Sequence, residues 1–290
     1  MTNLLAENIF GMKGYQTVIT GGGSGLGRMV ARGYVANGAS VCLVDMCQDR
    51  LEEVKEELLK IRGETYSESK ITSIVGDLST KEGINQILED IKAEISELDV
   101  LVNCAGIRKV NKLTYTPGES LEKLAAAANS SAYQDWDMTF RVNVFAPHFL
   151  SSGLVQLLGE SSAKDHGRGN VIFFSSVSSV HNTQYVPTYQ VSKAAVDHLV
   201  RIMAAELADK YIRVNAISPG LFPSRMNPSD ASLPESNMRY AKEMPAKRAG
   251  LEDEMVAAAL FLAKNKYMDG RILRIDGGRL LVAHGNIASE

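Results

Sequence analysis

Cysteine is scarce in this sequence, and its scarcity excludes several classes of protein. The chain of 290 residues contains three cysteines, Cys42, Cys47 and Cys104, and none of them forms a CxxC pair. An odd number without paired spacing argues against both a disulfide framework and a zinc cage. The five histidines show no HxH or HxxxH spacing, so we expect no metal site. A reducing, cytoplasmic location is expected.

Long apolar runs and an excess of charge are also missing. No stretch approaches the roughly 18 to 20 apolar residues that cross a bilayer, and the first residues do not resemble a signal peptide. The 31 basic and 34 acidic residues give a formal net charge of −3, which offers no broad cationic surface. We therefore expect no nucleic-acid or membrane partner, and the composition leaves a small neutral or anionic substrate open.

Apolar residues are abundant, and their pattern predicts the fold. They make up 45% of the chain, and short β-branched runs alternate with longer segments of helical period. This alternation is typical of an α/β protein with a Rossmann-type, doubly wound parallel sheet and helices on both faces. The seven expected strands are Gln16–Thr20, Ser40–Asp45, Ile71–Asp77, Val100–Cys104, Asn170–Ser175, Arg213–Ser218 and Arg271–Ile275. The expected helices are Leu26–Ala36, Arg50–Ile61, Lys81–Ile95, Asp135–Leu158, Thr188–Lys210 and Glu252–Ala263.

No repeat, low-complexity tract or linker divides the chain, so a single domain over residues 1–290 is expected. Two connections, about 107–133 and 221–251, are longer than ordinary turns. Long loops at the carboxyl ends of parallel strands bind ligands in such folds, so we expect both to contact substrate. The second loop offers adaptable apolar side chains, which would suit a partly apolar substrate or simply pack: Phe222, Met226, Met238, Tyr240 and Met244.

A glycine-rich turn follows the first expected strand. Residues Thr20–Gly27 read TGGGSGLG and lead into a helix. Glycine lets the backbone approach a pyrophosphate, which the positive helix N-terminus then holds, although such turns also serve packing alone. We assign this part of a dinucleotide site to Gly21, Gly23, Ser24, Gly25 and Leu26.

Asp45 ends the second expected strand, 18 residues after Gly27. A carboxylate at this position accepts the hydroxyls of an adenosine ribose and repels a 2′-phosphate. Neither Met46 nor Cys47, which follow, is basic, so we expect no cation beside Asp45. We therefore predict NAD as the preferred cofactor over NADP; the alternative for Asp45 is a solvated acid at a strand end.

Small or polar residues also close the third and fourth strands, as Gly76-Asp77-Leu78 and Asn103-Cys104-Ala105-Gly106. They suit an adenine edge and a backbone packed close to a cofactor, and a turn or cap is the alternative for each. The expected cofactor contacts here are Asp77, Leu78, Asn103, Ala105 and Gly106. Cys104 is interpreted as a buried small hydrophobe and not as a nucleophile.

Tyr189 and Lys193 are four residues apart, which places them on one face of a helix. An ammonium beside a phenol lowers the pKa of the phenol from about 10 toward working pH, so the pair is a candidate acid/base. Ser176 lies 13 residues before Tyr189 at a strand end, where its hydroxyl can bond the same substrate oxygen. Ser175, Ser178 and Ser179 are the alternatives, and capping is the other interpretation of all four.

Asn143 lies in the expected helix Asp135–Leu158, and Pro147 follows four residues later. Because proline lacks an N–H, the Asn143 carbonyl loses its helical partner. We predict that this carbonyl holds a water at the end of a proton relay from Tyr189 through the cofactor ribose and Lys193, and that the Asn143 side chain fixes the kink. The alternative is a simple proline kink.

In this order and spacing, the motifs resemble those of the short-chain dehydrogenase/reductase family in its compact, single-domain form. The resemblance extends from about Lys13 to Gly278 and includes Asn215, Pro219-Gly220 and Asp276-Gly277-Gly278. Two residues depart from the family pattern. Cys104 replaces the second asparagine of the NNAG motif, and Ser224 replaces a usual threonine but keeps the hydroxyl.

The resemblance implies an NAD(P)-dependent alcohol dehydrogenase or ketoreductase that moves a hydride between nicotinamide and a secondary alcohol or ketone. Its implied catalytic tetrad is Asn143, Ser176, Tyr189 and Lys193, of which Tyr189 and Lys193 also meet the cofactor. Its implied contacts to the nicotinamide side are Pro219, Gly220, Phe222 and Ser224. It also implies a homodimer or homotetramer built on the helices that hold Asn143 and Tyr189. The rival functions are a cofactor-binding scaffold or sensor without turnover, and non-redox use of the same site for cyclisation or dehydration.

Overall fold

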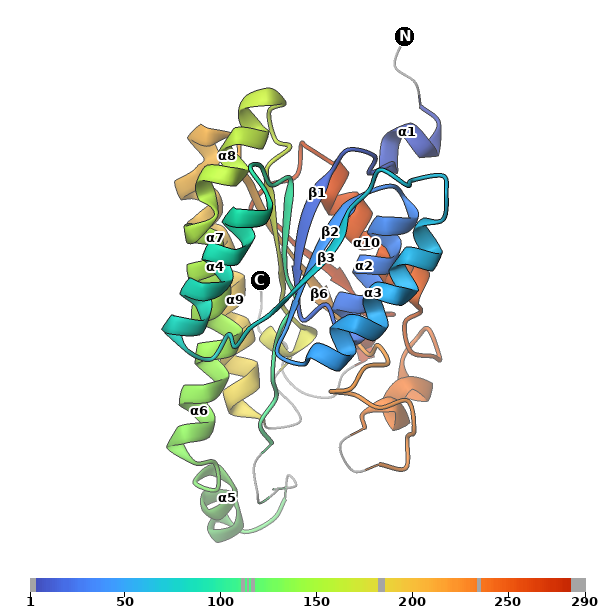
Figure 1. The fold of residues 1–290 in the computed structure, drawn as a ribbon. Coiled ribbons are helices and arrows are strands. Elements are labelled where there is room, and N and C mark those ends of the chain that lie inside the picture. Colours follow the sequence, from blue (N-terminus) through green and yellow to red (C-terminus); the bar gives the residue numbers. More distant parts are fainter. Residues whose placement is uncertain are drawn as a thin grey trace.

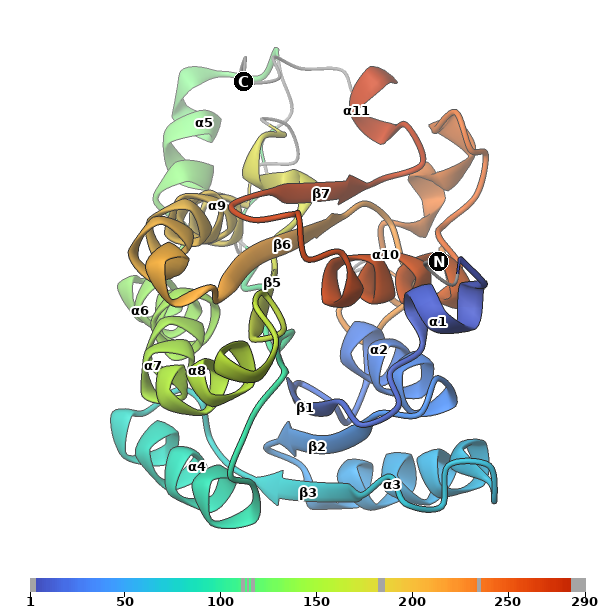
Figure 2. The ribbon, with the colours of Figure 1, turned by 90° about the horizontal axis from the view of Figure 1, so that it is seen from above.

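A seven-stranded sheet forms the centre of the computed structural model, which describes residues 4–110, 113, 115, 118–181, 186–233 and 236–282. The strand order is β3-β2-β1-β4-β5-β6-β7, and every neighbouring pair is parallel (Figures 1 and 2). The strands are β1 (Gln16–Thr20), β2 (Ser40–Asp45), β3 (Ile71–Val75), β4 (Val100–Asn103), β5 (Asn170–Phe174), β6 (Arg213–Pro219) and β7 (Ile272–Ile275). This order confirms the predicted doubly wound, Rossmann-type fold.

The sheet is covered on both faces because its apolar residues alternate between them. Val18 and Ile19, which are neighbours in β1, belong to two separate buried clusters, as do Cys42 and Leu43 in β2. Figure 2 shows the two helical layers on opposite sides of the sheet. One layer contains α2 (Gly25–Ala36), α3 (Gln48–Arg62) and α10 (Glu252–Lys264). The other contains α4 (Lys81–Glu94), α7 (Ala146–Gly153), α8 (Val155–Lys164) and α9 (Pro187–Leu207).

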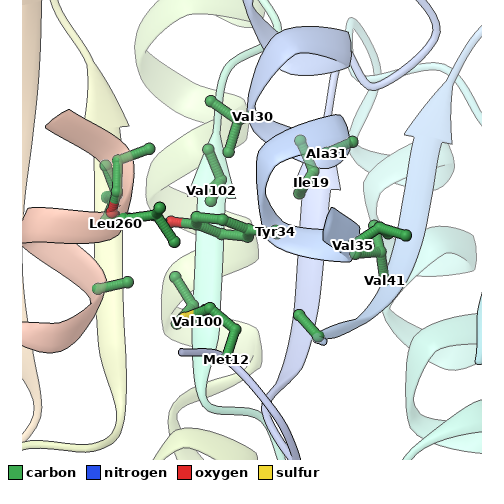
Figure 3. Packing of buried hydrophobic residues seen from close by; sticks show 14 of the residues in the cluster. Met12, Ile19, Val30, Ala31, Tyr34, Val35, Val41, Val100, Val102 and Leu260 are labelled. Carbon is green, nitrogen blue, oxygen red and sulfur yellow. Dashed lines mark hydrogen bonds between the residues drawn. The ribbon is translucent and has the colours of Figure 1, made fainter. Parts of the chain in front are cut away.

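Tyr34 is the largest fully buried side chain in the core beneath α2. Figure 3 shows its ring extending from α2 toward Leu260 of α10. Its hydroxyl donates a hydrogen bond of 3.2 Å to the Ala259 carbonyl, which satisfies the polar atom inside the core. Burial raises the pKa of Tyr34. This contact joins α2, which carries the glycine-rich turn, to α10.

The expected helix Asp135–Leu158 is not continuous, and this prediction was wrong. The chain forms α6 (Tyr133–Phe140), a π-helix η1 (Arg141–Phe145), then α7 and, after a break at Leu154, α8. Pro147 explains the change of period, because it has no N–H to bond the carbonyl four residues before it. The π-helix therefore contains Asn143, in the part of the helix that Pro147 was predicted to disturb.

Several strand ends differ from those expected by one or two residues. β3 ends at Val75 instead of Asp77, β4 at Asn103 instead of Cys104, and β5 at Phe174 instead of Ser175. At each of these ends the backbone leaves the ladder to form a loop at the carboxyl edge of the sheet. β6 instead continues one residue further, through Pro219, and β7 begins at Ile272 instead of Arg271.

The two long connections contain short helices that periodicity did not indicate. The first holds α5 (Leu121–Ala128), capped by the Ser120 hydroxyl, and Figure 1 shows this helix below α6, apart from the sheet. The second holds the 3₁₀ helix η4 (Met238–Glu243). Other short helices not expected are α1 (Ala6–Phe10), η2 (Val177–Ser179) and α11 (Arg279–Val282). The expected helix Thr188–Lys210 ends in the 3₁₀ helix η3 (Ala208–Lys210). Among the described helices, none combines the length and apolarity needed to cross a bilayer.

Candidate active site

The glycine-rich turn joins β1 to α2, and its backbone requires glycine at several positions. Gly21 and Gly25 have φ values of +68° and +53°. A Cβ on Gly21 would lie 2.9 Å from Ala105 Cα, and one on Gly23 would lie 2.9 Å from an Asp45 carboxylate oxygen. Ser24 caps α2 without a side-chain hydrogen bond in the described chain. The first amides of α2 are therefore available to a phosphate, and these residues fit a dinucleotide.

Thr20 fixes the end of β4 beside this turn. Its hydroxyl accepts hydrogen bonds from the backbone N–H of Cys104 at 3.1 Å and of Ala105 at 3.2 Å. Thr20 belongs to the glycine-rich motif, but no separate role was predicted for it. These bonds involve the backbone of Cys104, which explains why cysteine can replace asparagine there. Burial raises the pKa of the Cys104 thiol to about 12, consistent with an unreactive cysteine.

Asp45 stands at the tip of β2 and is 8% exposed. Its carboxylate accepts from the N–H groups of Gly23 and Cys47, each at 3.2 Å, and the Arg50 Nη2 lies 2.6 Å away. The expectation that no cation accompanies Asp45 was therefore wrong. Arg50 lies five residues further along the chain, in the first turn of α3, which folds back over the strand end. Its Nε is buried and has no partner among the described residues.

The other expected adenine-side residues lie along the same edge of the sheet. Asp77 follows β3 and is exposed, and its carboxylate accepts from the Ser79 N–H at 2.8 Å and the Ser79 hydroxyl at 2.9 Å. Leu78 is buried. Asn103 ends β4, donates to the Ser151 hydroxyl at 3.0 Å, and has a buried Oδ1 without a partner in the described chain. Because β3, β2, β1 and β4 are neighbours, these residues form a row beside the glycine-rich turn.

Tyr189, Ser176 and Lys193 converge at the start of α9. Lys193 is 4% exposed, donates a hydrogen bond of 2.7 Å to the Phe174 carbonyl, and its Nζ lies 5.6 Å from the centroid of the Tyr189 ring. Ser176 caps η2 by accepting from the Ser178 N–H at 3.1 Å. Ser176 and Tyr189 line one pocket. The structure thus brings together the three residues predicted to handle a proton.

The electrostatics of this cluster differ from the prediction. Burial raises the pKa of Tyr189, and the neighbouring Ser176 hydroxyl and the charge of Arg108 only partly oppose this rise. The predicted lowering by Lys193 was wrong for this structure, because desolvation of the phenolate dominates and the cation acting on it is Arg108. Burial also lowers the pKa of Lys193, to about 8, since the ammonium is removed from water.

Asn143 connects two parts of the site. Its side-chain Oδ1 accepts from the Ile107 N–H at 2.8 Å, and its Nδ2 donates to the Ile107 carbonyl and to the Ser192 hydroxyl, both at 3.0 Å. These bonds join the π-helix to Ile107 and to α9, and the role of this side chain in the kink stays a prediction. An amide carries both donor and acceptor, so it holds the backbone that follows β4 against α9. A Cβ on Gly106 would lie 3.4 Å from Asn143 Oδ1 and 3.6 Å from Lys193 Nζ, so Lys193 and Asn143 are close.

One pocket links the glycine-rich turn to Tyr189. It is lined by the four residues expected on the nicotinamide side, Pro219, Gly220, Phe222 and Ser224. Other residues in its lining are Leu26, Ser175, Val177, Ser178 and Leu221. Four further lining residues were not predicted, Arg108, Asn227, Asn237 and Arg279, and Met226 was expected only among the apolar side chains of the second loop. Of these, Arg108, Met226, Asn227 and Asn237 lie in the two long connections expected to contact substrate, whereas no local pattern marks Arg279. No three His, Cys, Asp or Glu side chains gather as metal ligands within the described ranges.

A second hollow lies away from this chemistry, on α6 and η1. It is lined by Tyr133, Trp136, Asp137, Phe140 and Phe145. None of the predicted catalytic or cofactor-binding residues lies there.

Comparison with known proteins agrees with this geometry. The family model for short chain dehydrogenase matches residues 16–233. The short-chain dehydrogenase/reductase PhomF of Diaporthe leptostromiformis is 30% identical over 294 residues, covering 97% of this chain and 96% of that protein. The 5-keto-D-gluconate 5-reductase of Escherichia coli (strain K12) is 29% identical, covering 95% and 99%.

Solved structures are similar over the same length. The Pseudomonas aeruginosa RhlG/NADP active-site complex shares 30% sequence identity and a TM-score of 0.78, with 93% of this chain and 98% of that chain covered. The matched region includes the glycine-rich turn, Asn143, Ser176, Tyr189 and Lys193. The chain therefore belongs to the short-chain dehydrogenase/reductase family of NAD(P)-dependent oxidoreductases.

Proposed function

We propose that this enzyme interconverts a secondary alcohol and a ketone, with Tyr189 as the acid/base. The observation that carries the proposal is one pocket lined by both Tyr189 and Ser176. The segment from Pro219 to Ser224 lines the same pocket, as does Leu26 at the start of α2. A bound nicotinamide cofactor would supply the hydride chemistry. The residues of the chain bind and orient the substrate and move its proton.

The roles follow from the contacts of each side chain. The Ser176 hydroxyl is oriented by the Ser178 N–H and can bond the substrate oxygen. Tyr189 exchanges the proton of that oxygen. Lys193 is held by the Phe174 carbonyl beside the Tyr189 ring, where it can bind a ribose hydroxyl. We propose that protons leave Tyr189 on the Lys193 side, toward Asn143.

We further propose that NAD is the preferred cofactor. Asp45 supports this, because two backbone N–H groups hold its carboxylate at the tip of β2. Arg50 weakens the repulsion of a 2′-phosphate, since its guanidinium balances Asp45. The preference is therefore expected to be moderate. The cofactor would contact the row formed by Gly21, Gly23, Ser24, Gly25, Leu26, Asp77, Leu78, Asn103, Ala105 and Gly106.

The chemistry named for the relatives supports a ketone or secondary alcohol as substrate. Similar proteins include the 5-keto-D-gluconate 5-reductase, a rhamnolipid-biosynthesis 3-oxoacyl-[acyl-carrier-protein] reductase and a galactitol 2-dehydrogenase. The test is to follow NADH and NADPH absorbance with purified protein and a panel of polyols, hydroxy acids and other secondary alcohols. Cofactor binding without redox change on any of them would favour the scaffold function. A product formed without redox change would favour cyclisation or dehydration.

We also propose a homodimer or homotetramer through the helices that carry Asn143 and Tyr189. Large apolar side chains are exposed along α6, η1, α7 and α9: Tyr133, Met138, Phe145, Phe149, Val191 and Ile202. Light scattering on the purified protein tests this by measuring the molar mass in solution. The variants Phe145→Ser and Ile202→Ser are expected to shift that mass toward the monomer. Tyr267→Ser is the matched control, because Tyr267 is fully exposed elsewhere on the surface.

The three cysteines support the proposed cytoplasmic location. Cys42, Cys47 and Cys104 are all free, as expected for a protein in a reducing compartment. Fractionation of cells that produce the protein, followed by immunodetection, tests this location.

A further inference from the structure

Arg279 is a buried cation that lines the same pocket as Tyr189 and Ser176. It is the first residue of α11, directly after Asp276-Gly277-Gly278, and is 9% exposed. Within the part of the chain that the structure describes, its guanidinium makes no hydrogen bond and no ion pair. A guanidinium carries five N–H donors, and those of Arg279 are not among the fully buried atoms without a partner, so they remain accessible at the pocket that Arg279 lines.

The acidic groups around Arg279 form no hydrogen bond or ion pair with its guanidinium in the described part of the chain. Asp276 uses its two carboxylate oxygens to accept from the backbone N–H groups of Gly278 and Leu280, each at 3.0 Å. Tyr240, Glu243 and Asp276 oppose the lowering of the Arg279 pKa by burial, but none of them bonds to the guanidinium. The Tyr240 ring lies 5.7 Å from Arg279 Cζ and supports one side of the guanidinium. As far as the described residues are concerned, the donors of Arg279 are thus free for a ligand.

The pocket as a whole has positive charge. Arg108 is its second arginine, and its Nη2 donates to the Met226 carbonyl at 2.9 Å, across the pocket from the β4 side to the second long loop. The charge of Arg108 acts directly on Tyr189. No aspartate or glutamate is among the described residues that line the pocket. An anionic group beside Tyr189 would therefore meet two arginines and no acidic side chain in the described pocket lining, with Glu243 and Asp276 acting on Arg279 from outside that lining.

We propose that Arg279 binds a carboxylate of the substrate, so that this enzyme acts on hydroxy acids and keto acids. This rests on the proposed function, since it assumes that the alcohol carbon lies at Tyr189. Arginine pairs with a carboxylate through two parallel N–H···O bonds, which fixes orientation as well as charge. In oxidation, the hydroxy acid loses a hydride to the oxidised cofactor and its hydroxyl proton to Tyr189, a carbonyl forms, and the carboxylate is unchanged.

A binding experiment tests the carboxylate site without turnover. Calorimetry on the NAD-loaded enzyme compares butyrate with butyramide, which have the same shape and differ in charge. Wild type is expected to bind butyrate about tenfold or more tightly, and Arg279→Gln to remove this difference. Arg279→Lys should keep part of it. The matched control is Arg239→Gln: Arg239 also lies over the Tyr240 ring, at 5.1 Å, but is exposed and outside the pocket lining.

Turnover gives a second readout, with hydroxy acids of increasing chain length compared with their methyl esters. We expect kcat/KM to favour the acids in wild type and in Arg239→Gln, and the preference to vanish in Arg279→Gln. Equal binding of butyrate and butyramide by wild type would overturn the proposal, even if alcohol oxidation depends on Tyr189. A loss of NAD affinity in Arg279→Gln with the butyrate preference intact would also overturn it, by assigning Arg279 to the cofactor. Arg279-dependent butyrate binding without any redox activity would support the site and reject the proposed function.

Discussion

The guanidinium of Arg50 lies 2.6 Å from the carboxylate of Asp45, at the tip of β2 beside the glycine-rich turn. The same carboxylate holds the Gly23 N–H. Asp45 is therefore part of the architecture of the turn as well as a candidate ribose ligand. Because Arg50 accompanies Asp45, the end of β2 carries a carboxylate suited to a ribose hydroxyl and a guanidinium suited to a phosphate.

NADH is expected to bind more tightly than NADPH, and the ratio should depend on this ion pair. Asp45→Asn leaves Arg50 without its counter-charge, so it should weaken NADH and strengthen NADPH by about tenfold each. Arg50→Gln should raise the preference for NADH. Dissociation constants from calorimetry decide this, and tighter binding of NADPH by wild type would contradict the assignment of Asp45.

Replacing Tyr189 by phenylalanine should abolish turnover and leave cofactor affinity nearly unchanged, because the substitution removes one hydroxyl in the pocket that Ser176 also lines. The loss in kcat should reach about a hundredfold or more. Tyr211→Phe, at an exposed tyrosine, is the control and should keep full activity. Lys193→Ala should lower both kcat and cofactor affinity, since Lys193 is assigned to both. Near-normal kcat in Tyr189→Phe would remove Tyr189 from the chemistry.

Asn143→Ala should reduce both stability and rate. The change leaves the Ile107 N–H and carbonyl without their side-chain partner, which costs about 1–3 kcal/mol in the free energy of unfolding. Because Ile107 follows Gly106 near Lys193, kcat should fall more than NAD affinity. Ser192→Ala removes one of the three bonds and should have a smaller effect. Urea denaturation and steady-state kinetics measure the two effects, and an unchanged kcat would show that Asn143 is structural only.

The buried Lys193 should make stability depend on pH. Its pKa is about 8 in the folded protein and near its ordinary value of 10.5 when unfolded. The unfolded chain therefore binds the proton of Lys193 more tightly than the folded chain does. Below about pH 8 the buried ammonium lowers the free energy of unfolding by its full amount, and this loss disappears as the pH rises toward 10.5. The difference between the two pKa values of Lys193 corresponds to a change of about 3 kcal/mol in the free energy of unfolding.

The pair of wild type and Lys193→Met isolates this effect, because the buried cysteines and tyrosines titrate in both proteins. Urea denaturation across this range should show that the free energy of unfolding of wild type rises with pH relative to that of the variant. A constant difference between the two proteins would show that Lys193 keeps an ordinary pKa in the fold.

The sequence by itself determined the sheet, the glycine-rich turn and the position of the acid/base pair, because each depends on local chemistry. Alternation of apolar residues assigns Val18 and Ile19 to opposite faces of β1, and only glycine adopts the backbone of the turn at Gly21. The spacing of Tyr189 and Lys193 follows from one helical turn. These features needed no knowledge of distant parts of the chain.

Tertiary structure decided what lies around those residues. The packing of the chain buries Tyr189, and this burial raises its pKa. The same packing places Arg108 and Arg279 in one pocket, although they are far apart in the sequence. It also directed the Asn143 amide to the Ile107 backbone, through a π-helix that helical periodicity does not distinguish from a regular one. Desolvation and long-range contacts depend on which segments pack together, so the local pattern of residues does not contain them.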